Sequence, residues 1–305
     1  MSADQRPGHL LGHPTAPPSS SLQRRSAART AVVWDALRTV LDGQDRGRPA
    51  SVVDIGGGTG GFAVRVAELG HRVVVVDPSP DALAILARRA DECGVADLVT
   101  GRQGDLDSLV DLVADLGGPT GAQPGRSGDE PGQGGADVVL CHGVLEIVDD
   151  PVVALAAVAR VLRPGGTLSL LVNQRHAAVV ARAMAGHFQQ ARALLDPAPA
   201  QASVAPPAPD TDRDSPRDAA RQRRFTAEEI TAALTGSGFD VEAMHAVRVF
   251  VDLVPSSLVD LETGSAQALV ELERAVAARP EYLALGTQIH AVAVRRGTAA
   301  SSLAG

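Results

Sequence analysis

The segment from Val52 to Asp77 constrains the fold more than any other part of the chain. It reads VVDIGGGTGGFAVRVAELGHRVVVVD: a β-like run, a turn with five glycines in six residues, a helical pattern and a second β-like run. A glycine turn between a strand and a helix lets a ligand approach the backbone closely. The segment therefore predicts a βαβ unit that binds a nucleotide.

The glycines satisfy two nucleotide-binding patterns at once. Gly56, Gly58 and Gly61 fit G-x-G-x-x-G, which is typical of dinucleotide sites. Four residues fit D-x-G-x-G-x-G, the usual pattern for S-adenosylmethionine: Asp54, Gly56, Gly58 and Gly60. The glycine pattern alone leaves both cofactors open.

Strand and helix patterns alternate through most of the chain. Apolar runs that indicate strands occur at Val52–Ile55, Arg72–Val76, Asp97–Thr100, Ala136–Gly143, Thr167–Val172 and Gln288–Val294. Helical patterns cover about 26–41, 60–69, 80–93, 151–162, 176–195 and 266–278, and Thr226 with Glu229 predicts a capped helix that ends at Gly236. This order predicts an α/β fold: a doubly wound, mostly parallel Rossmann-like sheet with helices on both faces.

The same pattern sets the expected domain organisation. Residues 26–296 are expected to form one domain, because 305 residues suit one large α/β domain with extensions. Residues 1–25 and 297–305 are expected to be tails, the former disordered. The Gly/Pro-rich stretch 117–135 reads as a flexible insertion, and the Pro/Ala/Asp-rich stretch 196–220 as a flexible cap or linker.

Composition limits the classes of function. The net charge is −8 and every fixed positive charge is an arginine, which argues against a broad basic surface for DNA. Local arginine clusters, such as the one around Arg223 and Arg224, leave an RNA-facing rim open. No apolar run is long enough to span a membrane. Cys93 and Cys141 have no metal or redox spacing, so we expect a cytoplasmic protein with reduced thiols and no metal.

The charge of Asp54 distinguishes between a dinucleotide and S-adenosylmethionine as the cofactor. A dinucleotide would place its pyrophosphate at the glycine turn, where the Asp54 carboxylate at the strand tip would repel it. The same carboxylate suits the cationic methionine end of S-adenosylmethionine, and Gly58 lies in the same turn. Asp77, at the tip of the second strand, suits ribose hydroxyls, and Asp105 lies where an adenine-contacting loop is expected. S-adenosylmethionine is the predicted cofactor.

Segments outside the glycine turn carry a resemblance to a known family. They are AARTAVVWDALRTVL before the first strand, CHGVLEIVDDP from Cys141, LRPGGTLSLLVNQRHAAVVARAMAGHF from Leu162, VRVFVD from Val247 and LGTQIH from Leu285. With these, the chain resembles class I S-adenosylmethionine-dependent methyltransferases, which share a seven-stranded sheet. Within them it is most similar to the bacterial tRNA 5-carboxymethoxyuridine methyltransferases, which esterify the carboxylate of a modified wobble uridine.

The resemblance implies a set of cofactor contacts: Arg29, Gly56, Gly57, Asp77, Gln103, Gly104 and His142. Each fits a physical role. Arg29 would pair with the methionine carboxylate, Gln103 and Gly104 would flank the adenine, and His142 would lie over the methionine end and the substrate mouth. The chain departs from the family at VNQRH, where Asn173 stands in place of an aromatic residue.

Methyl transfer is a displacement at a carbon that the sulfonium already activates, so alignment carries much of the catalysis. A carboxylate acceptor is ionised at pH 7 and needs no base. A hydroxyl or amine would need one, for which His142, His176 and His290 are candidates. Arg175 and Arg248 are candidates for holding a substrate carboxylate.

Three functions stay open: an RNA carboxyl-methyltransferase, a small-molecule O- or N-methyltransferase, and a protein that binds the cofactor without turnover. The first would place tRNA among the partners, alongside S-adenosylmethionine.

Overall fold

The computed structural model describes residues 21–44, 48–106, 108–112, 135–195, 223–255, 258 and 264–297. Residues 117–134 of the insertion expected over 117–135 lie outside these residues, as do the linker expected over 196–220 and residues 298–305 of the expected tail 297–305. The first helix, α1, spans Ser21–Gln44, so it begins within the stretch 1–25 that was expected to be a tail.

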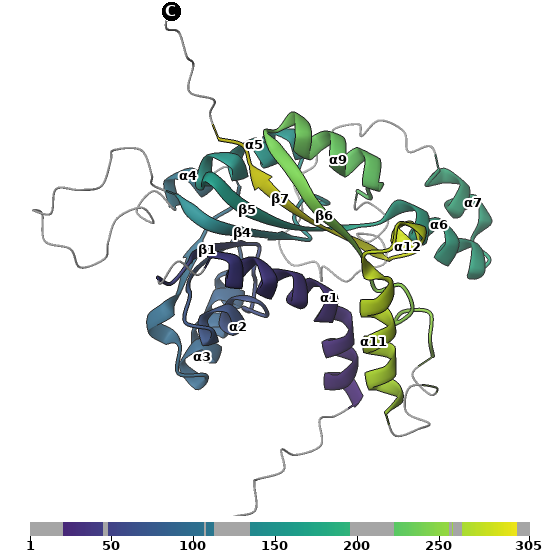
Figure 1. The fold of residues 1–305 in the computed structure, drawn as a ribbon, viewed down its shortest axis with the longest axis horizontal. Coiled ribbons are helices and arrows are strands. Elements are labelled where there is room, and N and C mark those ends of the chain that lie inside the picture. The colour runs from purple at the N-terminus through teal and green to yellow at the C-terminus, as the bar shows by residue number, and fades with distance from the viewer. Residues whose placement is uncertain are drawn as a thin grey trace, which may run out of the picture.

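The strands form one seven-stranded sheet in the order β3-β2-β1-β4-β5-β7-β6. Their bounds are β1 Ser51–Ile55, β2 Arg72–Asp77, β3 Val99–Gln103, β4 Ala136–His142, β5 Leu162–Asn173, β6 Phe239–Val247 and β7 Gln288–Arg295. All pairs from β3 to β5 are parallel, whereas β7 runs antiparallel between β5 and β6. The predicted doubly wound, mostly parallel α/β sheet is confirmed (Figure 1).

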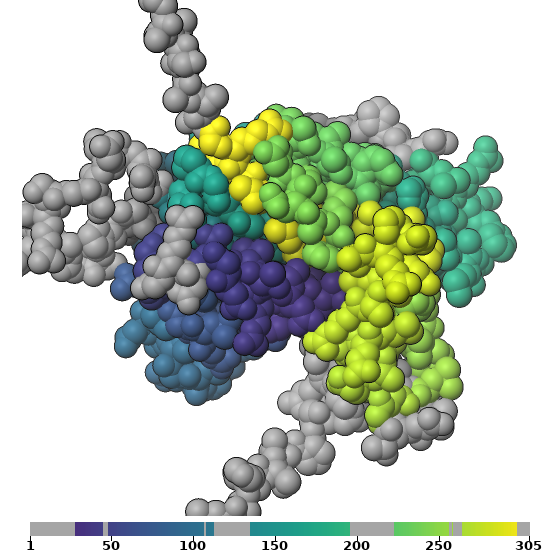
Figure 2. Space-filling model, in the orientation of Figure 1, coloured from purple at the N-terminus to yellow at the C-terminus, as the bar shows by residue number. Residues whose placement is uncertain are grey.

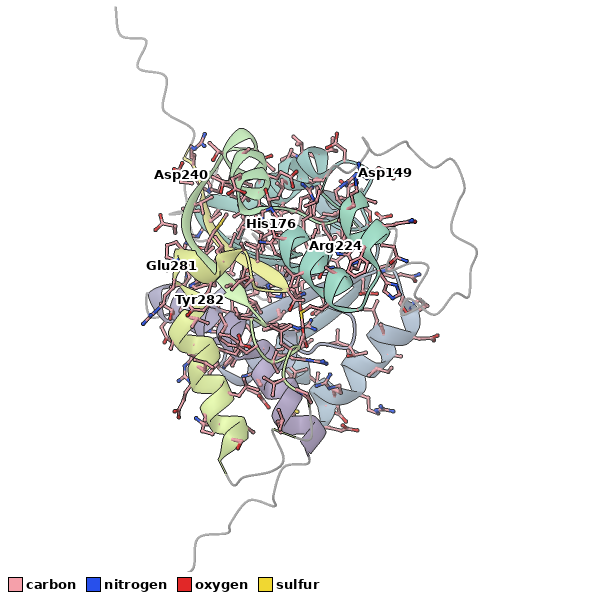
Figure 3. The ribbon with its side chains drawn as sticks, turned by 90° about the vertical axis from the view of Figure 1, so that its right-hand side faces the viewer. Asp149, His176, Arg224, Asp240, Glu281 and Tyr282 are labelled. Atoms are coloured by element: carbon pink, nitrogen blue, oxygen red, sulfur yellow. The ribbon has the colours of Figure 1, made fainter. Side chains whose placement is uncertain are left out.

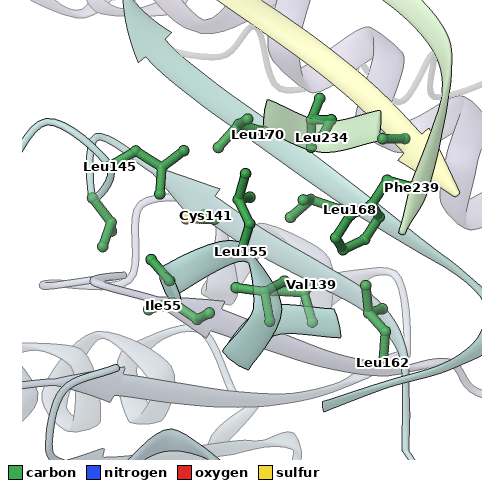
Figure 4. Close-up of a cluster of buried hydrophobic side chains, with 14 of the residues drawn as sticks. Ile55, Val139, Cys141, Leu145, Leu155, Leu162, Leu168, Leu170, Leu234 and Phe239 are labelled. Atoms are coloured by element: carbon green, nitrogen blue, oxygen red, sulfur yellow. The ribbon is translucent and has the colours of Figure 1, made fainter. Parts of the chain in front are cut away.

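Helices cover both faces of the sheet. On one face lie α1, α2 (Ala63–Glu68) and α3 (Pro80–Glu92), and on the other α4 (Leu109–Leu112), α5 (Pro151–Val161) and α9 (Ala227–Gly236) (Figure 1). α11 (Ser265–Ala277) packs beside α1, so segments from both ends of the chain meet on one side of the molecule (Figure 2). The core between the sheet and the α5 and α9 layer contains aliphatic side chains and Phe239 (Figure 4).

Several element boundaries differ from those expected. The helix expected over 176–195 is two helices, α6 (Arg175–Met184) and α7 (Phe188–Ala193), because Gly186 adopts a φ of +78° between them. α2 begins at Ala63 rather than at Gly60, since the glycines before it form the turn. The sequence pattern did not separate β6 as a strand. The short α12 (Pro280–Leu283) precedes β7. None of the described helices is long and apolar enough to cross a membrane.

Candidate functional site

The carboxyl ends of the parallel strands meet at one edge of the sheet. There the glycine turn follows β1, Asp77 ends β2, Gln103 ends β3 and His142 ends β4. Asp77 pairs in register with Gln103, which places both at the same level of the edge. Ligands of doubly wound folds bind outside this edge. The structure thus brings together the candidates that the sequence placed on separate strands.

The Asp77 carboxylate is tied to the glycine turn. Its Oδ2 accepts a hydrogen bond from the main-chain N–H of Gly58 at 3.0 Å, and its Oδ1 accepts one from that of Ser79 at 2.9 Å. Gly58 adopts a φ of +54°, which favours glycine and turns its N–H toward the carboxylate. The turn therefore fixes the orientation of Asp77, and this rigid acceptor suits a pair of ribose hydroxyls.

Asp54 is a buried acid under the same turn. Its side chain is 3% exposed, and the turn passes so close that a Cβ on Gly57 would lie 2.5 Å from its carboxylate. Burial, followed by the nearby charge of Asp77, raises the pKa of Asp54 to about 7. Two adjacent carboxylates favour a cationic ligand, which would restore the ionised form. This fits the cationic methionine end of S-adenosylmethionine and disfavours a pyrophosphate.

The loop after β3 is built around its own polar contacts. The Gln103 side-chain amide donates to the Pro78 carbonyl at 3.3 Å, and the Gly104 N–H donates to the Asp77 carbonyl at 3.2 Å. The Asp105 carboxylate accepts from the Ser108 main chain at 3.1 Å and from its hydroxyl at 2.9 Å. These contacts give Asp105 a turn-forming role, and they hold Gln103 and Gly104 beside Asp77.

His142 lies at the end of β4 with its ring against Phe62, whose centroid is 4.9 Å away in an edge-to-face contact. Its Nε2 is 2.9 Å from the Ser169 hydroxyl. Its Nδ1 is buried and has no hydrogen-bond partner among the described residues. Burial lowers the pKa of His142 to about 4, so the ring is neutral at pH 7. An unpaired buried nitrogen at this edge is an open position for a ligand.

Arg29 and Arg248 meet at one carboxylate. An Arg29 Nη2 lies 3.2 Å from Asp252 Oδ1, and an Arg248 Nη2 lies 2.6 Å from Asp252 Oδ2, which also accepts from the Thr287 hydroxyl at 3.0 Å. The buried Nε of Arg248 has no partner among the described residues. The Arg29 side chain, 46% exposed, remains open to a further anion.

The loop that carries Arg248 is held by one buried acid. Glu273 of α11 accepts the main-chain N–H groups of Val249, Phe250 and Val251 at 2.8–2.9 Å. Arg248 adopts a φ of +61°, a left-handed conformation that is strained for a residue with a side chain. The three hydrogen bonds to Glu273, which we call the Glu273 clamp, hold the residues that follow Arg248 and so keep Arg248 in this conformation.

Arg175 and His176 lie at the start of α6. An Arg175 Nη1 pairs with Glu229 at 2.8 Å, and Nη2 donates to the Arg224 carbonyl at 3.0 Å, so this guanidinium has structural partners. His176 is exposed, and Figure 3 labels it with Arg224 on the side of the molecule that bears α6. Of the two arginine candidates for a substrate carboxylate, the geometry favours Arg248.

Besides Glu273 and Asp252, sequence reasoning missed Glu146, Ser169 and His245. Glu146 is buried after β4, and its Oε1 accepts from the Asn173 main chain at 2.8 Å. Ser169 contacts His142 directly, and His245 is connected to Ser169 through His290. Ser169 sits in an apolar run as a lone polar residue, which was the available signal. Among the described residues, no group of three or more His, Cys, Asp or Glu side chains is arranged to hold a metal.

Residues 53–168 match the family described as Methyltransferase domain. They contain the glycine turn, Asp77 and His142. With the fold and the site, this match shows that the chain carries a methyltransferase domain and is an S-adenosylmethionine-dependent methyltransferase.

The chain is 29% identical over 265 residues to the tRNA 5-carboxymethoxyuridine methyltransferase of Escherichia coli strain K12, covering 87% of both chains. It is 32% identical over 159 residues to a ubiquinone biosynthesis O-methyltransferase of Xanthomonas campestris pv. campestris, covering 52% of this chain and 55% of that protein. The crystal structure of magnesium protoporphyrin IX methyltransferase from Synechocystis PCC 6803 shares the fold, with a TM-score of 0.51, 15% identity and coverage of 92% and 90%.

Proposed function

We propose that this methyltransferase esterifies the carboxylate of a modified uridine in tRNA. The observation that carries the proposal is the extent of the similarity to the tRNA 5-carboxymethoxyuridine methyltransferase, which covers 87% of both chains. An alignment of 265 residues must extend well beyond residues 53–168. It therefore includes parts of the chain that a generic cofactor-binding domain does not require.

In this proposal the edge of the sheet holds the cofactor. Asp77 accepts from the ribose hydroxyls, and Asp54 faces the cationic methionine end. Gly56, Gly57 and Gly58 have no side chain, so the cofactor can come close to the main chain of the turn. Gln103 and Gly104 flank the adenine while Asp105 shapes their loop. Arg29 contacts the methionine end, and His142 lies over that end and the substrate mouth. When bound, S-adenosylmethionine supplies a methyl group on a sulfonium sulfur.

The chemistry of the site suits a carboxylate acceptor. A carboxylate with an ordinary pKa near 4 is ionised at pH 7, so methyl transfer to it releases no proton and needs no base. His142 is neutral and its pKa is lowered to about 4, which makes it a weak base for a hydroxyl or an amine. Arg248 would hold the acceptor carboxylate through the guanidinium edge that Asp252 does not use.

An arginine-bearing side of the molecule supports RNA as the carrier of the acceptor. Burial, followed by the nearby charge of Arg182, lowers the pKa of Arg224, which places these two cations near each other. We call these two cations the local positive rim, and such a rim needs no overall positive charge. We propose that this rim contacts phosphates, and a cytoplasmic location is the corresponding prediction.

A small-molecule O-methyltransferase is the second candidate. The similarity to the ubiquinone biosynthesis O-methyltransferase favours it, together with the net charge of −8. That similarity covers about half of each chain, so it extends little beyond the part that binds the cofactor.

The test uses methyl-labelled S-adenosylmethionine with separate RNA and metabolite fractions from the native host, followed by mass spectrometry of the labelled product. We expect a base-labile methyl ester on a uridine of tRNA, and binding that weakens steeply with salt. Label confined to a hydroxyl of a metabolite would favour the second candidate. Arg248→Ala should raise KM for the RNA about 10-fold or more without changing the affinity for the cofactor.

A further inference from the structure

A chain of four side chains crosses the sheet from the candidate site to its edge strand. His142 Nε2 is 2.9 Å from Ser169 Oγ, and Ser169 Oγ is 2.8 Å from His290 Nε2. His290 Nδ1 is then 3.2 Å from His245 Nδ1. These groups come from β4, β5, β7 and β6 in turn, so each neighbouring strand supplies one member.

The register of the sheet aligns the chain. His142 pairs with Leu171, Leu171 with His290, and His290 with His245. Ser169 lies two residues before Leu171 and therefore faces the same side of the sheet. Ser169 and His290 are fully buried, while His245 on the edge strand is partly exposed.

The last contact is a hydrogen bond rather than a ring stack. The His290 and His245 rings are 21° from parallel with centroids 5.4 Å apart, yet their Nδ1 atoms are only 3.2 Å apart. Because the nitrogens are much closer than the centroids, they lie between the rings and point toward each other. One of them must carry the proton and the other the lone pair.

All three rings are neutral at pH 7. Burial lowers the pKa of His142 and of His245, and burial followed by the two neighbouring histidines lowers that of His290. The Nε2 atoms of His142 and His290 are the side-chain partners of the Ser169 hydroxyl, which carries one proton. When that proton is hydrogen-bonded to one ring, the hydroxyl accepts from the other, and the hydrogen bonds run in one common direction along the chain.

Two arrangements use the proton of the buried Ser169 hydroxyl, and leaving that proton unpaired would cost free energy. In one, the Ser169 hydroxyl donates to His142 Nε2, so that His142 carries its proton on Nδ1. Ser169 then accepts from His290 Nε2–H, and His290 Nδ1 accepts from His245. In the other, every donor and acceptor is reversed and His142 Nδ1 presents a lone pair. The unpaired Nδ1 at the site is thus coupled to a residue three strands away.

We propose that Ser169, His290 and His245 are positioning residues that hold neutral His142 with Nδ1–H directed at the acceptor carboxylate. This inference rests on the proposed function, because a carboxylate only accepts hydrogen bonds and so selects the first direction. The chain then sets both the orientation and the tautomer of His142. An acceptor that must lose a proton would select the reverse direction, in which His142 is a base.

Nitrogen NMR of the ¹⁵N-histidine-labelled full chain tests the direction. The protein is saturated with S-adenosylhomocysteine and titrated with 5-carboxymethoxyuridine, with uridine as the probe that lacks the carboxylate. The His142 signals are assigned from the spectrum of His142→Gln. We expect a single neutral Nδ1–H tautomer of His142 with the carboxylate probe. An Nε2–H tautomer, a mixture of tautomers or an imidazolium would overturn the proposal.

Kinetics test the positioning independently of the acceptor. Ser169→Ala should lower kcat about 10-fold or more while KM for S-adenosylmethionine stays unchanged. Ser169→Thr, which keeps the hydroxyl, should retain most of the rate, and His187→Ala at the exposed start of α7 serves as the control. A wild-type rate in Ser169→Ala would refute the positioning role even if tRNA is the substrate.

His245→Ala on the edge strand provides a second variant if Ser169→Ala does not fold. It should leave His142 as a mixture of tautomers, since the far end of the chain then loses its partner. An unchanged single tautomer would contradict the proposed coupling. Positioning shown by these variants with no methylation of RNA would refute the proposed function alone.

Discussion

The two halves of the edge are built in different ways. In the cofactor half, around β1, β2 and β3, the candidate residues lie within about fifty positions of one another, and Asp77 is held by backbone N–H groups of its own turn. In the half around β5, β7 and β6, which we propose holds the acceptor and call the acceptor half, the partners are distant in sequence. Ser169 and His290, for example, are 121 residues apart.

This difference explains what a sequence motif can encode. A turn that binds through its own backbone needs a fixed local order of residues, so its pattern is visible in the sequence. A site assembled by packing distant segments needs only that the fold bring them together. The comparison predicts that substitutions in the acceptor half leave cofactor binding intact. Substitutions in the glycine turn should abolish cofactor binding.

The largest effect is expected from a substitution of Glu273, whose hydrogen bonds form the clamp in the acceptor half. Glu273→Gln places an amide NH₂ against main-chain donors of residues 249–251 and should cost about 2–4 kcal/mol of unfolding free energy. The melting temperature should fall by roughly 5–10 °C. Glu271→Gln, at an exposed position of the same helix, is the control. A large loss of S-adenosylmethionine affinity in the folded variant would show that the halves are not independent.

Asp54 should make the ligand-free protein less stable at high pH. Its pKa is raised from 3.8 to about 7, so the folded state holds the proton more tightly and stability falls as the pH rises between these values. Asp54→Asn should therefore be more stable than wild type at pH 8, by on the order of 2–4 kcal/mol, and similar near pH 4.

Thermal unfolding at both pH values checks this prediction, with the exposed Asp97→Asn as the control. S-adenosylmethionine should stabilise the wild type but not Asp54→Asn. Equal stability of Asp54→Asn and wild type across the range would mean that Asp54 is solvated.

Asp77→Ala should weaken S-adenosylmethionine binding by about 1–3 kcal/mol, because charge-assisted hydrogen bonds to the ribose are lost. Calorimetry measures this, with Asp81→Ala at an exposed position of α3 as a matched control. Unchanged affinity in a folded Asp77→Ala would remove Asp77 from the site. Titration of the wild type with NAD should give no binding, and clear binding would refute the interpretation of Asp54.

The smallest effect is expected outside both halves. Deletion of residues 119–133, which lie outside the described residues, should change stability by less than about 1 kcal/mol, since a polar Gly/Pro segment buries little apolar surface. Cofactor affinity should stay the same by calorimetry. A fall of many degrees in melting temperature would show that this segment packs against the domain.

The sequence allowed prediction of the sheet, its mostly parallel order and the positions of Asp54 and Asp77, because strand periodicity and the glycine turn are local signals. The resemblance to a family led to His142 as a candidate, and its place after an apolar strand, at the carboxyl edge, agreed with that. It did not lead to the Glu273 clamp or to Ser169 as a partner of His142. Those contacts depend on where β7 is inserted and how α11 packs, which no local pattern specifies.

The position of β7 has a consequence for biosynthesis. β7 pairs with both β5 and β6, although residues 288–295 are made after both of them. On the ribosome, the nascent chain can pair β1 to β5 as they emerge, but the outer edge of β5 stays open and β6 has no neighbour until β7 leaves the exit tunnel. A nascent chain would therefore gain its glycine-turn half first, and the half around β5, β7 and β6 would close only after β7 has emerged.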